Sequence, residues 1–204
     1  MNKEFKDLFY EQLLLGEVSF KEQSDFLLKM ASYLEHGRTV EFVAEKLNKL
    51  LEFLYALDLD TKDAVRILTL YPAILNSIES LYDKYLFLGY IENLDNEVRK
   101  NKLLNSPRDF MIGLNKMYAR FSLIKDSGYG TYTWNNLVHA SDREFCKIFV
   151  KGTYNKPYQL FDNELQVLDY LSNVDIRGLD MSRIKEMTVN EELVSKYEGK
   201  GKRH

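Results

Sequence analysis

The chain has 204 residues, of which 45% are apolar and 29% are charged, and its formal net charge is −3 at pH 7. This composition is typical of a globular protein and excludes a disordered chain, which would combine few apolar residues with a high net charge. The length fits one domain, and the presence of only three prolines and ten glycines argues against an all-β protein with many tight turns.

The single cysteine, Cys146, excludes an internal disulfide and any metal site built from several cysteines. A chain without disulfides is typical of a reducing compartment, so we expect a cytoplasmic location. Residues 1–7 carry charge and lead into an amphipathic segment, so we expect no signal peptide. No run approaches the ~18 apolar residues of a membrane span, so we expect no association with a membrane.

Amphipathic helices are predicted from the start of the chain. Ser19 and Glu22 match the capping box, in which the two side chains satisfy free backbone N–H groups at the start of a helix. From residue 40 onward, apolar residues recur at three- and four-residue spacing and form one stripe, which is typical of a helix with one buried face. This stripe consists of Val40, Val43, Leu47, Leu50, Leu51, Leu54 and Leu57.

Two more stripes follow at the same spacing. They consist of Ile74, Ile78, Leu81, Tyr85 and Leu88, and then of Phe110, Leu114, Met117, Phe121 and Ile124. Ser106 and Pro107 predict a helix start, because serine is a good N-cap and proline fits the first helical position. Ser141 and Thr188 each stand three residues before a glutamate, and each therefore predicts a further capping box.

A period of about 35 residues relates these elements to one another. The breaks between helices align at Gly37, Pro72, Pro107 and Ser141, at steps of 35, 35 and 34 residues. An apolar residue stands four places before each break, namely Tyr33, Leu68, Leu103 and Leu137. Each unit is expected to contain a short helix, a break, and a longer helix opened by proline or a small residue.

The sequence therefore predicts a single all-α domain over residues 1–204, built as a right-handed, α-solenoid-like stack of helix-pair repeats. Residues 1–29 are expected to form N-terminal helices and residues 30–160 about four repeats. C-terminal helices are expected over residues 161–197, followed by a basic tail at residues 198–204 with the sequence EGKGKRH.

One repeat unit, residues 65–91, has the sequence VRILTLYPAILNSIESLYDKYLFLGYI. It resembles the repeat of the mitochondrial transcription termination factor (mTERF) family, which has apolar residues around a proline and a leucine-rich helix ending in a Leu-Gly pair. The matching residues are Leu68, Pro72, Leu75, Leu81, Leu88 and Gly89. The next unit keeps Leu103, Pro107, Met117 and Phe121 but has Lys125 in place of the glycine. The resemblance extends over residues 30–160, and the outer units carry Gly37 and Ser141 in place of the proline.

The resemblance implies a curved stack of helices with a concave, basic surface that binds duplex DNA or structured RNA. The charge distribution agrees with it only in the middle of the chain. Residues 97–160 hold 11 Lys and Arg against 5 Asp and Glu, a net charge of +6, whereas residues 1–60 hold 7 against 12, a net charge of −5.

The basic residues of the middle segment are the candidate nucleic-acid contacts. In a stack of repeats they would form a ladder on one face and bind successive phosphates. The alternative is a solvated helix face with surplus lysines. The candidates are Arg99, Lys100, Lys102, Arg108, Lys116, Arg120, Lys125, Arg143, Lys147 and Lys151.

Three aromatic residues, Tyr129, Tyr132 and Trp134, lie in the glycine-broken segment GYGTYTW near this ladder. Aromatic rings beside basic residues can stack on exposed bases. Trp134 also occupies the repeat position of Met30 and Val65, which favours the interpretation that it packs in the core.

No catalytic or metal-binding pattern is present in the sequence. His139 and Cys146 are seven residues apart and have no acidic partner at a recognisable spacing. We therefore expect no enzyme activity, no metal and no cofactor. The leading hypothesis is a nucleic-acid-binding regulator of transcription or of a mobile element. The alternative is a protein-binding adaptor or inhibitor that uses the concave face of the stack.

Overall fold

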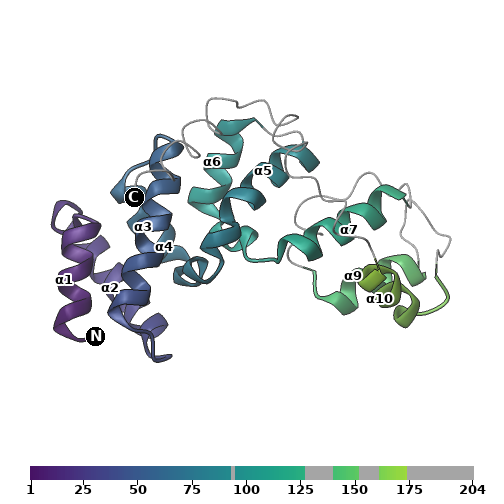
Figure 1. Cartoon of the computed structure of the whole chain (residues 1–204), viewed down its shortest axis with the longest axis horizontal. Coiled ribbons are helices and arrows are strands. Elements are labelled where there is room, and N and C mark those ends of the chain that lie inside the picture. The colour runs from purple at the N-terminus through teal and green to yellow at the C-terminus, as the bar shows by residue number, and fades with distance from the viewer. Residues whose placement is uncertain (93–94, 127–139, 152–160, 174–204) are drawn as a thin grey trace.

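The computed structural model describes residues 1–92, 95–126, 140–151 and 161–173. Every regular element within these residues is a helix, so the all-α prediction is confirmed for this part of the chain. The helices follow one another along the long axis of the molecule, from α1 at one end to α9 and α10 at the other (Figure 1). None of the described helices is both long enough and apolar enough to cross a membrane.

The N-terminal helices begin at side-chain caps. Asn2 caps the first helix, and Ser19 and Glu22 form the predicted capping box, with the Ser19 N–H donating to the Glu22 carboxylate at 3.0 Å. Thr39 caps the longest of the described helices, which carries the first apolar stripe. The elements are α1 (Lys3–Gln12), the 3₁₀-helix η1 (Leu15–Glu17), α2 (Phe20–Leu34) and α3 (Val40–Ala56).

In the middle of the chain, an α-helix, a 3₁₀-helix and a second α-helix follow one another twice in the same order. These are α4 (Thr61–Leu70), η2 (Pro72–Ser80) and α5 (Leu81–Glu92), and then α6 (Asn96–Asn105), η3 (Pro107–Phe110) and α7 (Leu114–Asp126). Asp60 and Asp95 cap the first helix of each unit and are 35 residues apart. Tyr71 and Ser106 end those helices, also 35 residues apart, with φ angles of −152° and −142°.

One detail of the predicted unit was wrong. Pro72 and Pro107 each open a 3₁₀-helix, and the longer α-helix begins only later, at Leu81 or Leu114. The residue before a proline is pushed out of the α conformation by the pyrrolidine ring, so α4 and α6 must end there. The chain then turns through 3₁₀ geometry, in which the proline at the first position loses no hydrogen bond.

The C-terminal part of the described chain consists of α9 (Asp142–Lys151) and α10 (Glu164–Asn173). Ser141 and Glu144 form the predicted capping box: the Ser141 N–H donates to the Glu144 carboxylate at 2.9 Å, and the Glu144 N–H donates to Ser141 Oγ at 3.2 Å. The predicted start at Thr188 and the basic tail lie outside the described residues.

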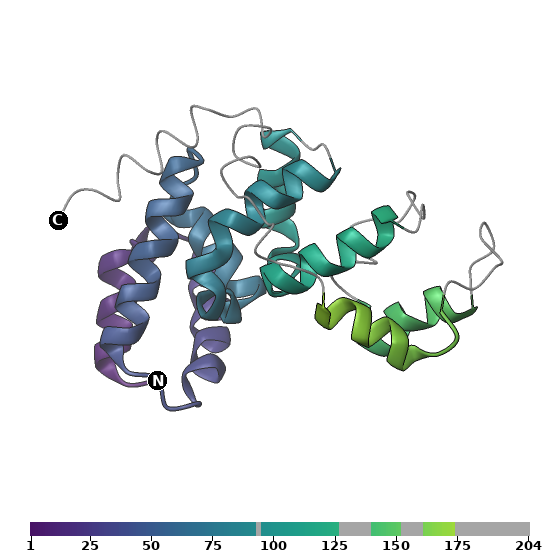
Figure 2. The ribbon, with the colours of Figure 1, turned by 45° about the vertical axis from the view of Figure 1, so that its right-hand side comes forward.

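Several helices pack against the helix that follows them by one unit, and α7 packs against α10 near the end of the described chain. The first helices form one series of contacts, from α2 to α4 to α6, while α5 contacts α7 and α7 contacts α10. The turned view shows α7, α9 and α10 following the helices of the first half (Figure 2). The matched apolar positions Leu47, Leu81 and Met117 are fully buried, so the apolar stripes form the core as expected.

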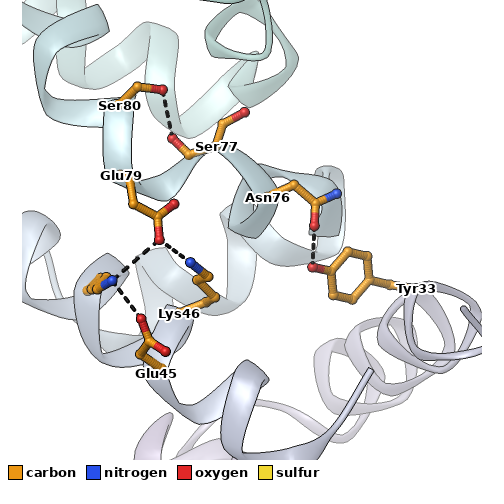
Figure 3. Close-up of polar contacts among 8 residues, drawn as sticks. Tyr33, Glu45, Lys46, Asn76, Ser77, Glu79 and Ser80 are labelled. Carbon is orange, nitrogen blue, oxygen red and sulfur yellow. Dashed lines mark hydrogen bonds and ion pairs between the residues drawn. The ribbon is translucent and has the colours of Figure 1, made fainter. Parts of the chain in front are cut away.

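Polar contacts reinforce the junction between α2, α3 and η2 (Figure 3). The Tyr33 hydroxyl donates to Asn76 Oδ1 at 2.9 Å, which ties α2 to η2. Lys46 and Lys49 of α3 both form ion pairs with Glu79 of η2. Because these partners lie 30 to 43 residues apart in sequence, they hold tertiary rather than local structure.

Candidate nucleic-acid interface

A cleft of about 400 Å³ opens where the break between α6 and α7 meets the start of α9. We call it the basic cleft. It collects residues from the end of α4, from η3 and the turn after it, from α7, and from the residue before the α9 capping box. It is lined by Tyr71, Arg108, Met111, Ile112, Gly113, Lys116, Arg120 and Ala140.

Three of the ten basic residues predicted from the sequence line this cleft. Arg108 is exposed and follows Pro107 in η3, so the break in the helix pair places it at the cleft. Lys116 and Arg120 are four residues apart on α7 and therefore share one face of that helix. The cleft thus joins cationic side chains from two separate elements.

Arg120 is held firmly at the base of this cationic group. Only 1% of it is exposed, and its Nη2 donates to the Ala140 carbonyl at 3.1 Å and to Asp142 Oδ1 at 2.8 Å. The guanidinium also lies over the Phe145 ring, 4.5 Å from its centroid. Such contacts fix the orientation of a planar cation before any ligand arrives.

Asp142 bridges the two α7 cations. Its Oδ1 lies 2.8 Å from Lys116 Nζ and 2.8 Å from Arg120 Nη2. The hydrogen bond from Lys116 and that from Arg120 hold the pKa of this carboxyl below its ordinary value against the opposing effect of partial burial. The cluster of Arg108, Lys116, Arg120 and Asp142 therefore carries three positive charges and one negative charge.

Arg99 was predicted to be an exposed contact of the ladder, but it is buried and makes structural contacts. It is 3% exposed, and its Nη1 donates to the Tyr85 carbonyl at 3.3 Å while the guanidinium lies over the Tyr85 ring. Burial lowers the pKa of its guanidinium. Arg120 is likewise buried, so neither arginine lies on an exposed ladder as the sequence pattern predicted; Arg120 reaches only the wall of the cleft.

The remaining predicted contacts are dispersed. Lys100 pairs with Glu97 at 3.0 Å, and Lys102 is half-buried on the same helix, α6. On α9, Arg143 is exposed and Lys147 is half-buried, and neither lines the cleft. The side chains of two others, Lys125 and Lys151, lie outside what the structure describes, as do the aromatic residues Tyr129, Tyr132 and Trp134.

A second groove, of about 680 Å³, runs between α2, α4 and the end of α6. We call it the acidic groove, because its lining holds four carboxylates and two cations. Leu70 at its edge is 51% exposed. The lining consists of Glu17, Val18, Ser19, Glu22, Asp25, Lys62, Asp63, Val65, Arg66, Thr69, Leu70 and Asn105.

Comparisons of the chain with protein-family models, with curated proteins and with solved structures found no match. The function is therefore inferred from the sequence and the geometry of this chain. The described residues contain no group of three or more His, Cys, Asp or Glu side chains arranged to hold a metal ion. Cys146 is buried, and burial raises the pKa of its thiol, which disfavours the reactive thiolate.

Sequence reasoning did not single out Tyr71, which lines the basic cleft, or Asp142, which pairs with two of its cations. Tyr71 precedes Pro72, and only the extended backbone forced at that position brings its side chain to the lining of the cleft. Asp142 was one acid among many in the sequence. Its position directly after the N-cap Ser141, 22 residues from Arg120, gives no sign of the ion pair between them.

Proposed function

We propose that this protein is a helical-repeat regulator that binds nucleic acid, as the sequence predicted, and that it binds through the basic cleft rather than along a ladder of all ten basic residues. The observation that carries the proposal is the convergence of Arg108, Lys116 and Arg120 at one concavity. Phosphate groups supply the charge and the hydrogen-bond acceptors that such a cluster binds best.

The arrangement of the cations supports phosphate binding in two ways. Arg120 is immobilised by its contacts, so little side-chain entropy is lost when it meets an anion. Arg108 is exposed and Lys116 is half-exposed, so both can approach a polyanion without losing a buried environment. A cleft with a net positive charge also attracts a polyanion from a distance in low salt.

We propose in addition that the architecture is a right-handed stack of repeats similar to that of the mTERF family. The helix caps at Asp60 and Asp95 and the breaks at Tyr71 and Ser106 support this, because both recur after 35 residues. The contacts of first helices with first helices also favour it. On this proposal the protein is a cytoplasmic, non-enzymatic regulator of transcription or of a mobile element.

A retention assay with charge-neutralising variants tests the function. The wild type is incubated at low salt with labelled duplex DNA, single-stranded DNA and structured RNA, and compared with Arg108→Gln and Lys116→Gln. Both variants are expected to lose most of the retention with no change in melting temperature, because exposed charges contribute little to stability. Lys29→Gln, an exposed lysine on α2, is the matched control and should bind as the wild type does. No retention of any nucleic acid by the wild type would refute the proposal.

The second candidate function is that of a protein-binding adaptor or inhibitor, and the acidic groove favours it. Glu17, Glu22 and Asp25 line the groove together with the exposed side chain of Leu70. A surface of that kind suits a peptide with basic and apolar residues. The test is binding of a synthetic Lys- and Leu-rich helical peptide to the wild type and to Asp25→Asn, with Glu52→Gln on α3 as the control. Equal affinity for the wild type and Asp25→Asn, or an equal loss in Glu52→Gln, would argue against this function.

A further inference from the structure

We propose that the basic cleft holds one unpaired nucleotide, whose phosphate takes the place of the Asp142 carboxylate beside Lys116 and Arg120. This inference rests on the proposed function and specifies its ligand: single-stranded nucleic acid rather than a duplex. Three observations support it: the size of the cleft, a lining that combines cations with aromatic and apolar residues, and the Asp142 carboxylate that bridges Lys116 and Arg120.

The size and lining of the cleft suit a nucleotide. Its volume of about 400 Å³ lies within the range of ~300–1,000 Å³ common for small-ligand pockets. The lining combines cations with the ring of Tyr71 and the apolar side chains of Met111 and Ile112. A base in a duplex is already stacked on both faces, whereas an unpaired base can pack against an aromatic ring and apolar side chains.

The Asp142 carboxylate occupies the position that an anionic ligand would take. It accepts from Lys116 and Arg120 together, yet its side chain is 52% exposed, so solvent and solutes reach it. A phosphate group brings more acceptor oxygens and at least as much negative charge to the same two donors. The exchange therefore replaces the two ion pairs of Asp142 by stronger ones.

Local structure also limits the cost of displacing Asp142. It is the first residue of α9, so its carboxylate stays near the partial positive charge of the helix N-terminus after it turns away from Lys116 and Arg120. The capping box of Ser141 and Glu144 does not involve the Asp142 side chain, so the start of the helix stays intact when that side chain turns away. Asp142 thus acts as an internal competitor that lowers the affinity of the cleft for phosphate.

Competition by Asp142 has a consequence opposite to that of most site mutations. Asp142→Asn should tighten the binding of a single-stranded oligonucleotide by about three- to tenfold, because the competing charge is removed while the cations stay. Glu97→Gln is the matched control, since Glu97 is also an exposed carboxylate paired with a lysine, but its partner Lys100 does not line the cleft. It should leave the affinity unchanged.

The experiment measures fluorescence anisotropy of a labelled short oligothymidylate and of a duplex of equal length, with AMP, adenosine and inorganic phosphate as competitors. We expect the single strand to bind at least about tenfold more tightly than the duplex, and AMP to compete better than adenosine or phosphate. Tyr71→Leu should weaken the single strand by about fivefold or more, the loss typical of one stacked base, without changing competition by phosphate. Melting temperatures of all variants are recorded, and if Tyr71→Leu does not fold, Asp142→Asn carries the test.

The outcomes separate this inference from the proposed function. Equal binding of single strand and duplex, with no effect of Asp142→Asn, would overturn the inference, while a weaker affinity in Arg108→Gln would keep the proposed function. Failure of both nucleic acids to bind would overturn both. AMP binding as tightly as the oligonucleotide would support the nucleotide cleft and overturn the function as a nucleic-acid binder.

Discussion

The guanidinium group of Arg99 packs directly against the backbone of Gly89. A Cβ atom at position 89 would lie 2.7 Å from Arg99 Nη1 and 2.8 Å from its Cζ. Because Arg99 is 3% exposed, its side chain has little room to retreat. The glycine of the Leu-Gly pair at the end of the α5 stripe therefore has a packing role: it makes space for an arginine from α6.

This contact predicts a strong coupling between the two positions. Alanine at position 89 would gain ~1 kcal/mol of helix propensity, but it would displace a buried arginine from the Tyr85 carbonyl. We expect Gly89→Ala to destabilise the protein by about 1–2 kcal/mol in urea denaturation. In an Arg99→Met background the same substitution should be neutral or stabilising. Equal costs in both backgrounds would show that the two residues are not coupled.

A charge in the core should be far more damaging than the same charge on the surface. Leu81 is fully buried at the start of α5, at a position matched in the neighbouring units. Leu81→Asp is expected to cost more than about 3 kcal/mol, or to prevent folding, because it buries an unpaired carboxylate. Leu28→Asp is the control, since Leu28 on α2 is 70% exposed. Similar melting temperatures for wild type and Leu81→Asp would contradict the assignment of the repeat positions.

The apolar periodicity was sufficient to predict the helices and the buried stripe, because burial of one helix face produces that spacing directly. It did not distinguish Arg99, which is buried, from Arg108, which is exposed. The burial of Arg99 depends on the space beside Gly89 and on its contacts with Tyr85, both of which are on α5. The 3₁₀-helices after the prolines were also missed, since a proline opens either kind of helix. The cleft could not be predicted from the sequence, because its lining residues are spread from Tyr71 to Ala140 and only the tertiary fold brings them together.

Because Lys84 is buried, we expect the free energy of unfolding to rise as the pH becomes alkaline. The residue is 1% exposed, its ammonium group donates to the Phe110 carbonyl at 2.9 Å, and burial lowers its pKa from 10.5 to about 8. Between these values the unfolded chain holds a proton that the folded protein has lost, so the free energy of unfolding rises with pH. The full contribution is on the order of 3 kcal/mol.

Urea denaturation between about pH 8 and 10 checks this, with Lys84→Met as the comparison. Burial raises the pKa values of Cys146, Tyr33 and Tyr85, but these residues are present in both proteins and do not contribute to the difference between them. The difference between the wild type and Lys84→Met should therefore change steadily in favour of the wild type as the pH rises. Parallel pH profiles for the two proteins would contradict the lowered pKa.

The ion pair of Glu79 should give a smaller change in the free energy of unfolding at acidic pH. Its hydrogen bond with Lys46 lowers the pKa of its carboxyl from 4.5 to about 2. The ion pair therefore stabilises the fold fully above about pH 4.5, and this stabilisation disappears as the pH falls toward 2. Because the side chain is 52% exposed, we expect Glu79→Gln to cost less than ~1 kcal/mol at neutral pH and in low salt. The two proteins should converge in acid; a constant difference down to the lowest pH would refute this.

The salt dependence of binding tests most directly whether the cleft cations hold phosphate. The affinity of a short single strand is measured across a salt series for the wild type, Arg108→Gln and Lys29→Gln. We expect log K to fall linearly with log salt, with a slope shallower by about 0.7 in Arg108→Gln, because that variant neutralises one phosphate fewer, and a slope unchanged in Lys29→Gln. An affinity independent of salt, or the same slope in the wild type and in Arg108→Gln, would contradict phosphate binding by the cleft.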